Sequence, residues 1–284
     1  MAGRVEGKVA IVTGGASGIG AALGRGLAAR GARVILADRD AEGAGTEAER
    51  LRSAGGRAEG VTLDVRDAAA VGDVVTGVFR RHGRLDYLFN NAGIAVGGEV
   101  SVLSGEDWKE AVDVNLMGPV HGILAAYPRM VEQGFGHIVN TASMAAFMAT
   151  PLAAPYGATK SAVLGLSRAL RIEGAGYGVR VSVLCPGVVR TAILENGGRY
   201  GRLRAVLDLT AQRAMWECLR PMNADLFAVN VLAAVAKNRA VIVVPSWWRA
   251  VRLLNAVLPS LADALAAREL RTVRAMLPRH PPDS

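Results

Sequence analysis

Short apolar runs alternate with amphipathic stretches along most of the chain. The runs predict seven strands, over residues 9–13, 33–37, 59–63, 85–89, 136–142, 180–185 and 241–244. Helical spacing fills the intervals, with helices predicted to end near residue 30 and to cover 41–54, 68–82, 106–131, 156–173 and 224–237. Fully apolar strands that alternate with helices are typical of a parallel sheet covered on both faces. The pattern therefore predicts a doubly wound α/β fold with a mainly parallel seven-stranded sheet.

The same pattern divides the chain into one large domain and an extension. Residues 1–245 hold all seven predicted strands, whereas 246–284 show apolar residues only at helical spacing, interrupted by Pro259. Three interpretations of this helical extension stay open. It packs against a substrate lid or a partner subunit, it lies on a membrane surface as tryptophan and arginine would favour, or it is a loosely ordered tail.

A glycine-rich turn joins the first strand to the first helix. Its glycines lie at positions 14, 18 and 20. Because glycine has no Cβ, such a turn lets the backbone approach a pyrophosphate at a helix N-terminus. We therefore predict that Gly14, Ser17, Gly18, Ile19 and Gly20 bind a dinucleotide.

The residues after the second strand bear on which dinucleotide is bound. Asp38 can accept hydrogen bonds from both adenosine ribose hydroxyls and would repel a 2′-phosphate, which favours NAD over NADP. Arg39 complicates this choice, because it can pair with a 2′-phosphate or cover the adenine face. No basic residue occupies Ala16 or Ser17, and NAD is the favoured cofactor.

The candidate chemistry lies between Ser143 and Lys160. Tyr156 and Lys160 are four residues apart, so on a helix they share one face. A free tyrosine has a pKa of about 10, and a nearby lysine cation is expected to lower it towards the working pH. Ser143 ends the fifth predicted strand and can hold a substrate oxygen while Tyr156 exchanges a proton with it.

These motifs occur in one order together with Asn90-Asn-Ala-Gly93, Asn115 and Pro186-Gly187. In that order they resemble the short-chain dehydrogenase/reductase family, in its compact single-domain branch, over roughly residues 7–245. The resemblance implies a Rossmann-type fold and hydride transfer between a nicotinamide and a secondary alcohol or ketone.

The resemblance also implies a role for each matched residue. Tyr156 would be the acid–base, Lys160 would lower its pKa and hold the ribose, Ser143 would position the substrate oxygen, and Asn115 would complete a proton relay through water. The other cofactor contacts that it implies, with Tyr156 and Lys160 among them, are Asp64, Val65, Asn91, Ala92, Gly93, Pro186, Gly187, Val189 and Thr191.

Two variable stretches bear on the substrate. Residues 190–224 are predicted to form a mobile lid, with a surface helical insert as the plainer alternative. The loop 144–155 is apolar. Together they predict a roomy apolar pocket for a lipophilic alcohol or ketone. Its expected lining is Met144, Phe147, Met148, Met215 and Trp216.

The composition restricts the class of protein but does not indicate its function. The 284 residues carry a formal charge of +8, which an acidic cofactor, an anionic surface or solubility would each explain. Aromatic and basic residues do not alternate as in nucleic-acid platforms, so no nucleic acid is expected. Two cysteines and an N-terminus without an apolar signal region favour a cytoplasmic protein, with membrane association left open. No metal site is predicted.

Other functions compete with NAD-dependent alcohol oxidation. Arg39 keeps open an NADPH-dependent reductase of ketones or acyl thioesters. A non-catalytic NAD-binding sensor or scaffold is the alternative from another class, but a pure binder has no need of a tuned phenol. The resemblance implies a homodimer or homotetramer built on the helices at 106–131 and 156–173, although the extension could block one interface.

Overall fold

The computed structural model describes residues 5–194, 200–204 and 209–276. Seven strands form one sheet in the order β11-β7-β6-β4-β1-β2-β3, and every neighbouring pair is parallel. The strands are β1 (Val9–Thr13), β2 (Arg33–Asp38), β3 (Arg57–Thr62), β4 (Tyr87–Asn90), β6 (Gly136–Thr141), β7 (Val179–Pro186) and β11 (Val241–Val244). The predicted doubly wound fold is confirmed, and the strand ends differ from the predicted ones by two residues at most.

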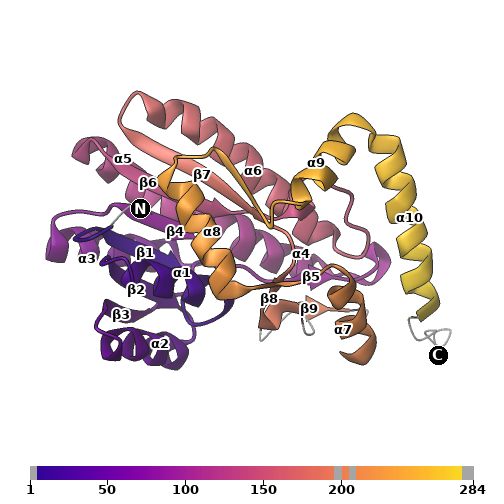
Figure 1. Cartoon of the computed structure of the whole chain (residues 1–284), viewed down its shortest axis with the longest axis horizontal. Helices are drawn as coiled ribbons and strands as arrows, with labels where there is room; N and C mark the ends of the chain where they lie inside the picture. Colours follow the sequence, from indigo (N-terminus) through magenta and orange to yellow (C-terminus); the bar gives the residue numbers. More distant parts are fainter. Residues whose placement is uncertain (1–4, 195–199, 205–208, 277–284) are drawn as a thin grey trace.

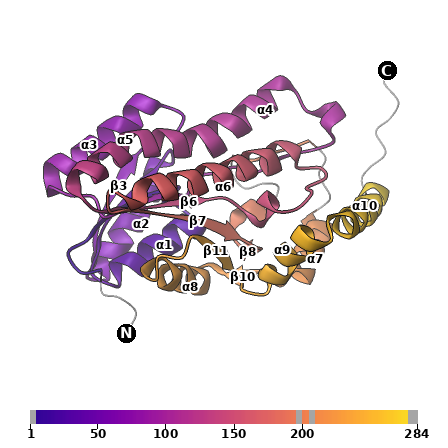
Figure 2. The ribbon, with the colours of Figure 1, turned by 90° about the horizontal axis from the view of Figure 1, so that it is seen from above.

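Helices cover both faces of the sheet (Figures 1 and 2). One layer holds α1 (Gly18–Ala28), α2 (Ala41–Ser53) and α8 (Ala224–Ala236), and the other holds α3 (Ala68–His82), α5 (Gly118–Gln133) and α6 (Ala154–Ala175). Successive strand residues point to opposite faces. Val12 and Leu36 therefore join the core under α1 and α8, while Ile11 and Ile35 join the core under α3 and α5.

The long helix predicted over 106–131 is interrupted. It consists of α4 (Gly105–Val112), a π-helical turn η2 (Asp113–Met117) and α5. Proline has no N–H, so Pro119 cannot donate the i+4 hydrogen bond to the Asn115 carbonyl, which is one cause of a wide turn here. The uniform helical pattern of the sequence does not reveal this interruption.

Short elements crowd the carboxyl edge of the sheet. Two small parallel pairs form there, β5 (Val96–Gly97) with β9 (Arg202–Leu203), and β8 (Val189–Arg190) with β10 (Met222–Asn223). The remaining elements are η1 (Val100–Val102), η3 (Met144–Ala146), η4 (Ala192–Leu194) and α7 (Leu209–Cys218). Residues 195–199 and 205–208 of the predicted lid lie outside the described residues, and Arg199 is among them.

The extension forms two helices, α9 (Trp248–Val257) and α10 (Pro259–Met276), with a bend of 116° between them. Pro259 begins α10, a position where its missing N–H costs no helical hydrogen bond. In Figure 1 α10 lies at one end of the molecule, away from the sheet. Within the described ranges no single helix is long and apolar enough to cross a membrane, although α9 and α10 pass that test as a bent pair.

Candidate active site

The glycine turn closes only because its residues lack side chains. Gly14 and Gly18 have positive φ angles of 69° and 54°. A Cβ built on Gly20 would lie 1.9 Å from the Gly14 carbonyl oxygen, so no larger residue fits there. Ser17, the N-cap of α1, makes no side-chain capping hydrogen bond. The first N–H groups of α1 are therefore available to an anion, and the turn fits a pyrophosphate.

Asp38 closes this turn on its far side. Its carboxylate accepts hydrogen bonds from the backbone N–H of Ala16 and of Asp40, each at 3.0 Å. Its neighbour Arg39 lies over the ring of Tyr200, with 3.3 Å from Cζ to the ring centroid. Tyr200 was not predicted from the sequence, because nothing in its sequence neighbourhood indicates a contact with residue 39.

Asp64 and Val65 follow β3 at the same edge. The Asp64 carboxylate pairs with Arg66, whose hydrogen bond lowers the pKa of Asp64. The Val65 carbonyl lies 2.9 Å from Nδ1 of His121. Both predicted cofactor residues therefore have protein partners, and the carboxylate that would meet an adenine amino group is shared with Arg66.

Thr13, which the sequence analysis missed, holds the segment after β4. Its hydroxyl oxygen accepts from the backbone N–H of Asn91 and of Ala92, both at 3.0 Å. The Asn91 side chain donates back to the Thr13 carbonyl at 3.1 Å. A Cβ on Gly93 would lie 3.3 Å from Nζ of Lys160, so this segment passes directly beside that lysine.

A chain of buried polar side chains supports that edge from inside. Asn90 donates to the side chain of Asn140 at 2.8 Å, and Asn140 donates to the hydroxyl of Ser167 at 3.0 Å. Ser167 donates to the Val163 carbonyl within α6. The network links β4, β6 and α6, so the strand that ends at Ser143 and the helix that carries Tyr156 keep a fixed relation. Asparagines inside apolar strands were the available sequence signal.

Lys160 and Tyr156 occupy one face of α6, as predicted. Lys160 is 3% exposed, its Nζ donates to the Thr141 carbonyl at 2.9 Å, and it lies 5.6 Å from the centroid of the Tyr156 ring. Burial lowers the pKa of Lys160 to about 8. The lysine is therefore poised to change its charge near neutral pH.

The lowering of the Tyr156 pKa by Lys160 stays a prediction. Tyr156 is half-buried, and the desolvation of its phenol raises the pKa of Tyr156, while the hydrogen bond with Ser143 lowers it. Lys160 loses its own charge more readily when buried, which weakens the stabilisation it can offer a phenolate. Ser143 begins η3, where its hydroxyl oxygen also accepts from the Ala145 N–H at 3.1 Å.

Asn115 lies in the π-helical turn and is fully buried. Its side chain accepts from the Ile94 N–H at 2.9 Å and donates to the Ile94 carbonyl at 3.0 Å. The side-chain amide is thus used to hold the backbone after Gly93. The backbone carbonyl, which lacks an i+4 donor at Pro119, is the better acceptor for a water.

The turn after β7 lies opposite the glycine turn. Gly187 donates its N–H to the Val244 carbonyl at 2.9 Å, and Val189 in β8 pairs with Met222. A Cβ on Gly18 would lie 3.2 Å from Cγ2 of Thr191, so the structure brings these two predicted cofactor segments together. Pro186 ends β7 beside them.

An unexpected contact joins this turn to the extension. Trp248, the first residue of α9, is 7% exposed, and a Cβ on Gly187 would lie 2.1 Å from its indole nitrogen. Trp248 belongs to one apolar cluster with Met144, which is buried, and with Phe147, Met148 and Trp216, which are half-buried. The extension therefore packs against four of the residues that are predicted to line the substrate pocket.

Met215 does not belong to this cluster. It is half-buried on α7 beside Trp216, and its role as a lining residue stays a prediction. The other four predicted lining residues come together in the cluster.

The predicted lid is tied to α4 by an ion pair. Arg204 donates to both carboxylate oxygens of Asp107 at 2.8–3.2 Å, which lowers the pKa of Asp107 to about 2. Backbone bonds add to this, because Arg202 and Arg204 donate to the carbonyls of Ala95 and Gly97, each at 2.8 Å. Arg202 also pairs with Glu110.

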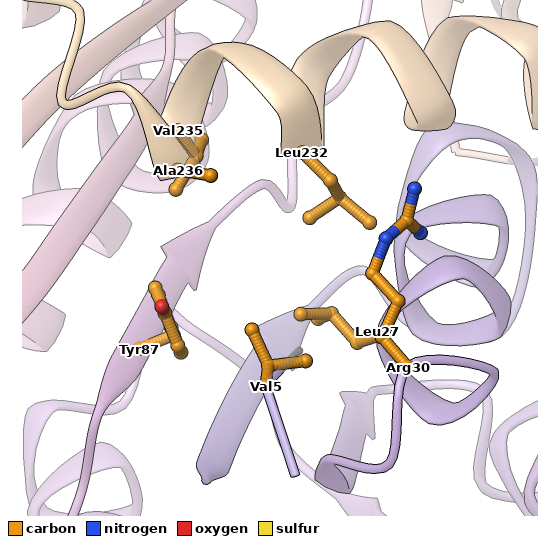
Figure 3. Close-up of a pocket in the computed structure, with 7 residues that line it drawn as sticks. All are labelled: Val5, Leu27, Arg30, Tyr87, Leu232, Val235 and Ala236. Carbon is orange, nitrogen blue, oxygen red and sulfur yellow. The ribbon is translucent and has the colours of Figure 1, made fainter. Parts of the chain in front are cut away.

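The hollow shown in Figure 3 is a different place. It lies between the C-terminal ends of α1 and α8 and is lined by Val5, Leu27, Arg30, Tyr87, Leu232, Val235 and Ala236. Tyr87 begins β4, so this hollow is at the amino edge of the sheet, opposite the edge where open α/β sheets bind ligands. Among the described residues no group of three His, Cys, Asp or Glu could hold a metal ion.

Comparison with known proteins agrees with this geometry. The family model for short chain dehydrogenases matches residues 8–199. D-threitol dehydrogenase of Mycolicibacterium smegmatis is 43% identical over 190 residues, which cover 67% of this chain and 73% of that protein. A short-chain dehydrogenase/reductase from Burkholderia phymatum, solved in complex with NAD, has a TM-score of 0.82 and 33% identity, covering 91% of this chain and 96% of its own.

A metagenomic short-chain oxidoreductase solved in complex with NADP has a TM-score of 0.69 at 31% identity, covering 85% of this chain and 98% of its own. The similar structures thus include complexes with either nicotinamide cofactor. The chain belongs to the short-chain dehydrogenase/reductase family and is a nicotinamide-dependent oxidoreductase of alcohols and ketones.

Proposed function

We propose that this protein transfers a hydride between NAD and a lipophilic secondary alcohol or ketone, with Tyr156 as the acid–base. One observation carries the proposal. Ser143, Tyr156 and the buried Lys160 meet at the carboxyl edge of the sheet, beside a glycine turn shaped for a pyrophosphate. Bound nicotinamide would supply the hydride acceptor.

The protein residues would handle the proton. In alcohol oxidation the Ser143 hydroxyl holds the substrate oxygen, and Tyr156 takes the hydroxyl proton as the hydride leaves the carbon. Lys160, when charged, favours the phenolate that receives it. The proton then leaves Tyr156 for solvent, and a water held by the Asn115 carbonyl would connect Lys160 with that solvent. In ketone reduction the same groups act in reverse.

The test of Tyr156 is a pair of measurements on Tyr156→Phe. We expect turnover of a lipophilic secondary alcohol to fall by about 10²- to 10⁴-fold, the usual contribution of a positioned acid–base. NAD affinity, measured by calorimetry, should stay within about twofold, because the phenylalanine keeps the ring. Retained turnover would refute the assignment, whereas loss of both properties would indicate a folding defect.

The preference for NAD rests on Asp38. Two backbone N–H groups hold its carboxylate at the end of β2, and Arg39 is engaged with the Tyr200 ring. We expect calorimetry to show tighter binding of NAD than of NADP, and Asp38→Asn to narrow the gap by removing the charge that repels a 2′-phosphate. Tighter binding of NADP by the unchanged protein would overturn this preference and favour an NADPH-dependent reductase.

The lipophilic substrate class rests on the apolar cluster around Met144. Its described side chains next to the catalytic residues are Phe147, Met148, Trp216 and Trp248. We further propose that residues 190–224 act as the lid over this cluster, held by Arg204. Turnover confined to small polar or phosphorylated carbonyls in a substrate panel would refute the lipophilic class.

We also propose that the protein assembles as a homodimer or homotetramer through α5 and α6. Leu124 on α5 and Ile172 on α6 are 67% and 79% exposed, and an interface built on these helices would cover them. Gel filtration with light scattering tests this. A monomer at micromolar concentration would refute it.

A further inference from the structure

Large apolar side chains on α9, on α10 and at the bend between them are exposed. Five of them are each 49–65% exposed: Leu253, Val257, Leu258, Leu261 and Leu265. Leu253 and Val257 are one turn apart on α9, Leu258 follows α9 at the bend, and Leu261 and Leu265 are one turn apart on α10. We call these five residues the apolar bend. Exposed apolar surface of this kind marks an interaction site.

Other side chains of the same helices anchor them to the protein. Trp248 and Val251, on the side of α9 opposite Leu253 and Val257, pack into the apolar cluster of the active site. On α10, Ala262 is buried and lies on the same side as Leu258 and Leu265, whereas Arg274 on the other side pairs with Glu99 at 2.6 Å. Both helices are therefore anchored, and the half-exposed leucines of α10 border a buried residue, so the apolar bend is a fixed surface feature.

Charge indicates what covers the apolar bend. Arg249 lies one turn before Leu253, and Arg268 lies one turn after Leu265. Both arginines are exposed, and none of the described carboxylates pairs with either. Residues 246–276 hold five arginines against two acidic residues, on a chain of net charge +8.

From these observations we propose that the apolar bend docks on an anionic lipid surface. Leucine and valine side chains would enter the boundary between headgroups and acyl chains, while Arg249 and Arg268 meet lipid phosphates. A second copy of the chain is a poorer occupant, because a two-fold contact would bring the flanking arginines of both copies together.

The docking has a consequence for the substrate, which rests on the proposed function. One helix, α9, carries Leu253 and Val257 towards the lipid and Trp248 towards the catalytic cluster. A docked protein therefore has its apolar site next to the bilayer. Lipophilic alcohols or ketones dissolved in the membrane would be the substrates it meets first.

The test is co-sedimentation of the full chain with vesicles. We expect binding to vesicles of phosphatidylcholine mixed with phosphatidylglycerol, weaker binding at high salt, and little binding to pure phosphatidylcholine. The double variant Leu261→Asp/Leu265→Asp should bind the anionic vesicles at least about tenfold more weakly. The matched control is Leu226→Asp/Val229→Asp, which places the same two charges at side chains on α8 that are 54% and 48% exposed and should bind as the unchanged protein does.

Each result decides the proposal. Equal binding by the double variant and the control would overturn it, and so would a shift of the double variant alone to a smaller species in gel filtration, which would assign the surface to self-association. If the double variant fails to fold, Arg249→Gln/Arg268→Gln replaces it and should remove the preference for anionic vesicles. Vesicle binding without turnover of any soluble ketone would contradict the proposed function and leave the docking intact.

Discussion

The two sides of the active site are held together by different means. On the cofactor side, Gly14, Gly20 and the Asn90–Asn140 pair fix the backbone through close approach and buried hydrogen bonds. On the substrate side, Arg204 and the extension are fixed by ion pairs and by the indole of Trp248. This comparison indicates that the predicted cofactor site depends on the shape of the backbone. The predicted substrate site depends instead on side chains, which substitutions could change without altering the backbone.

The largest effect, on NAD binding, is expected at Gly20, where the backbone leaves no room for a side chain. Gly20→Ala places a Cβ 1.9 Å from the Gly14 carbonyl oxygen, so the turn must open. We expect NAD binding to fall below detection in calorimetry. Gly165→Ala is the control, because a Cβ there meets nothing within 4 Å in the middle of α6. That change should raise stability by about 0.5–1 kcal/mol. Normal NAD affinity of Gly20→Ala would contradict the close-approach argument.

The next largest effect, on stability, is expected where Gly187 on one side of the site contacts Trp248 on the other. Gly187→Ala would drive a Cβ into the indole of Trp248, and overpacking of this kind costs about 1–3 kcal/mol. Thermal or denaturant unfolding measures it. In the Trp248→Ala background the same change should cost much less, since the clashing ring is gone. Equal costs in both backgrounds would show that Trp248 does not press on the turn.

As the pH falls, the stabilising contribution of His137 in the core should be lost before that of the Asp107 ion pair with the predicted lid. His137 is buried in β6, and burial lowers its pKa to about 3. Its Nε2–H donates to Ser182, whose hydroxyl donates to the Arg239 carbonyl, so the neutral ring is the bonded form. Because the unfolded state takes up this proton first, the stabilising contribution is complete above about pH 6.5 and is lost as the pH falls towards 3.

The expected loss is roughly 1.4 kcal/mol for each pH unit below about 6. His137→Gln should flatten denaturant stability over that range. Asp107, with its pKa lowered to about 2, contributes above pH 4 and loses its effect only between about pH 4 and 2. A stability curve that is unchanged in His137→Gln would contradict the assignment of the upper range to this histidine.

The smallest effect is expected at the lid. Arg204→Gln removes the bidentate ion pair of the buried Asp107 carboxylate, which keeps its hydrogen bonds from Ser104, whereas Arg190→Gln breaks an exposed pair with Glu217. The loss of an ion pair at a buried carboxylate costs more than the loss of an exposed pair, which contributes little. We expect Arg204→Gln to raise KM severalfold with little change in kcat, and Arg190→Gln to leave both within about twofold. Equal effects of the two changes would refute the lid contact.

Features that depend on the spacing of residues along the chain could be predicted from the sequence. The seven strands, the glycine turn and the pairing of Tyr156 with Lys160 follow from periods of two and 3.6 and from the missing Cβ of glycine. The interrupted helix at Asn115 was not foreseen. Its cause, the missing N–H of Pro119, lies four residues away, inside a pattern that otherwise reads as continuous helix.

Contacts between segments that are far apart in the sequence could not be predicted from the sequence alone. Trp248 meets Gly187 across 61 positions, and Arg39 meets Tyr200 across 161, with no local pattern to link either pair. The direction of the pKa shift of Tyr156 could not be predicted from the sequence for a related reason. Charge proximity was visible in the spacing, but the burial that outweighs it depends on residues from β6, η3 and α9 that the spacing does not show.

The packing of Trp248 on the turn at Gly187 also sets an order of assembly during synthesis. Domains form from the N-terminal side as the chain leaves the ribosome, and all seven strands precede Trp248 in the sequence. The cofactor side can therefore be in place before the wall of the substrate site exists. A chain that has not yet released α9 would lack this contact, so the turn at Gly187 would reach its packed form only once α9 has docked.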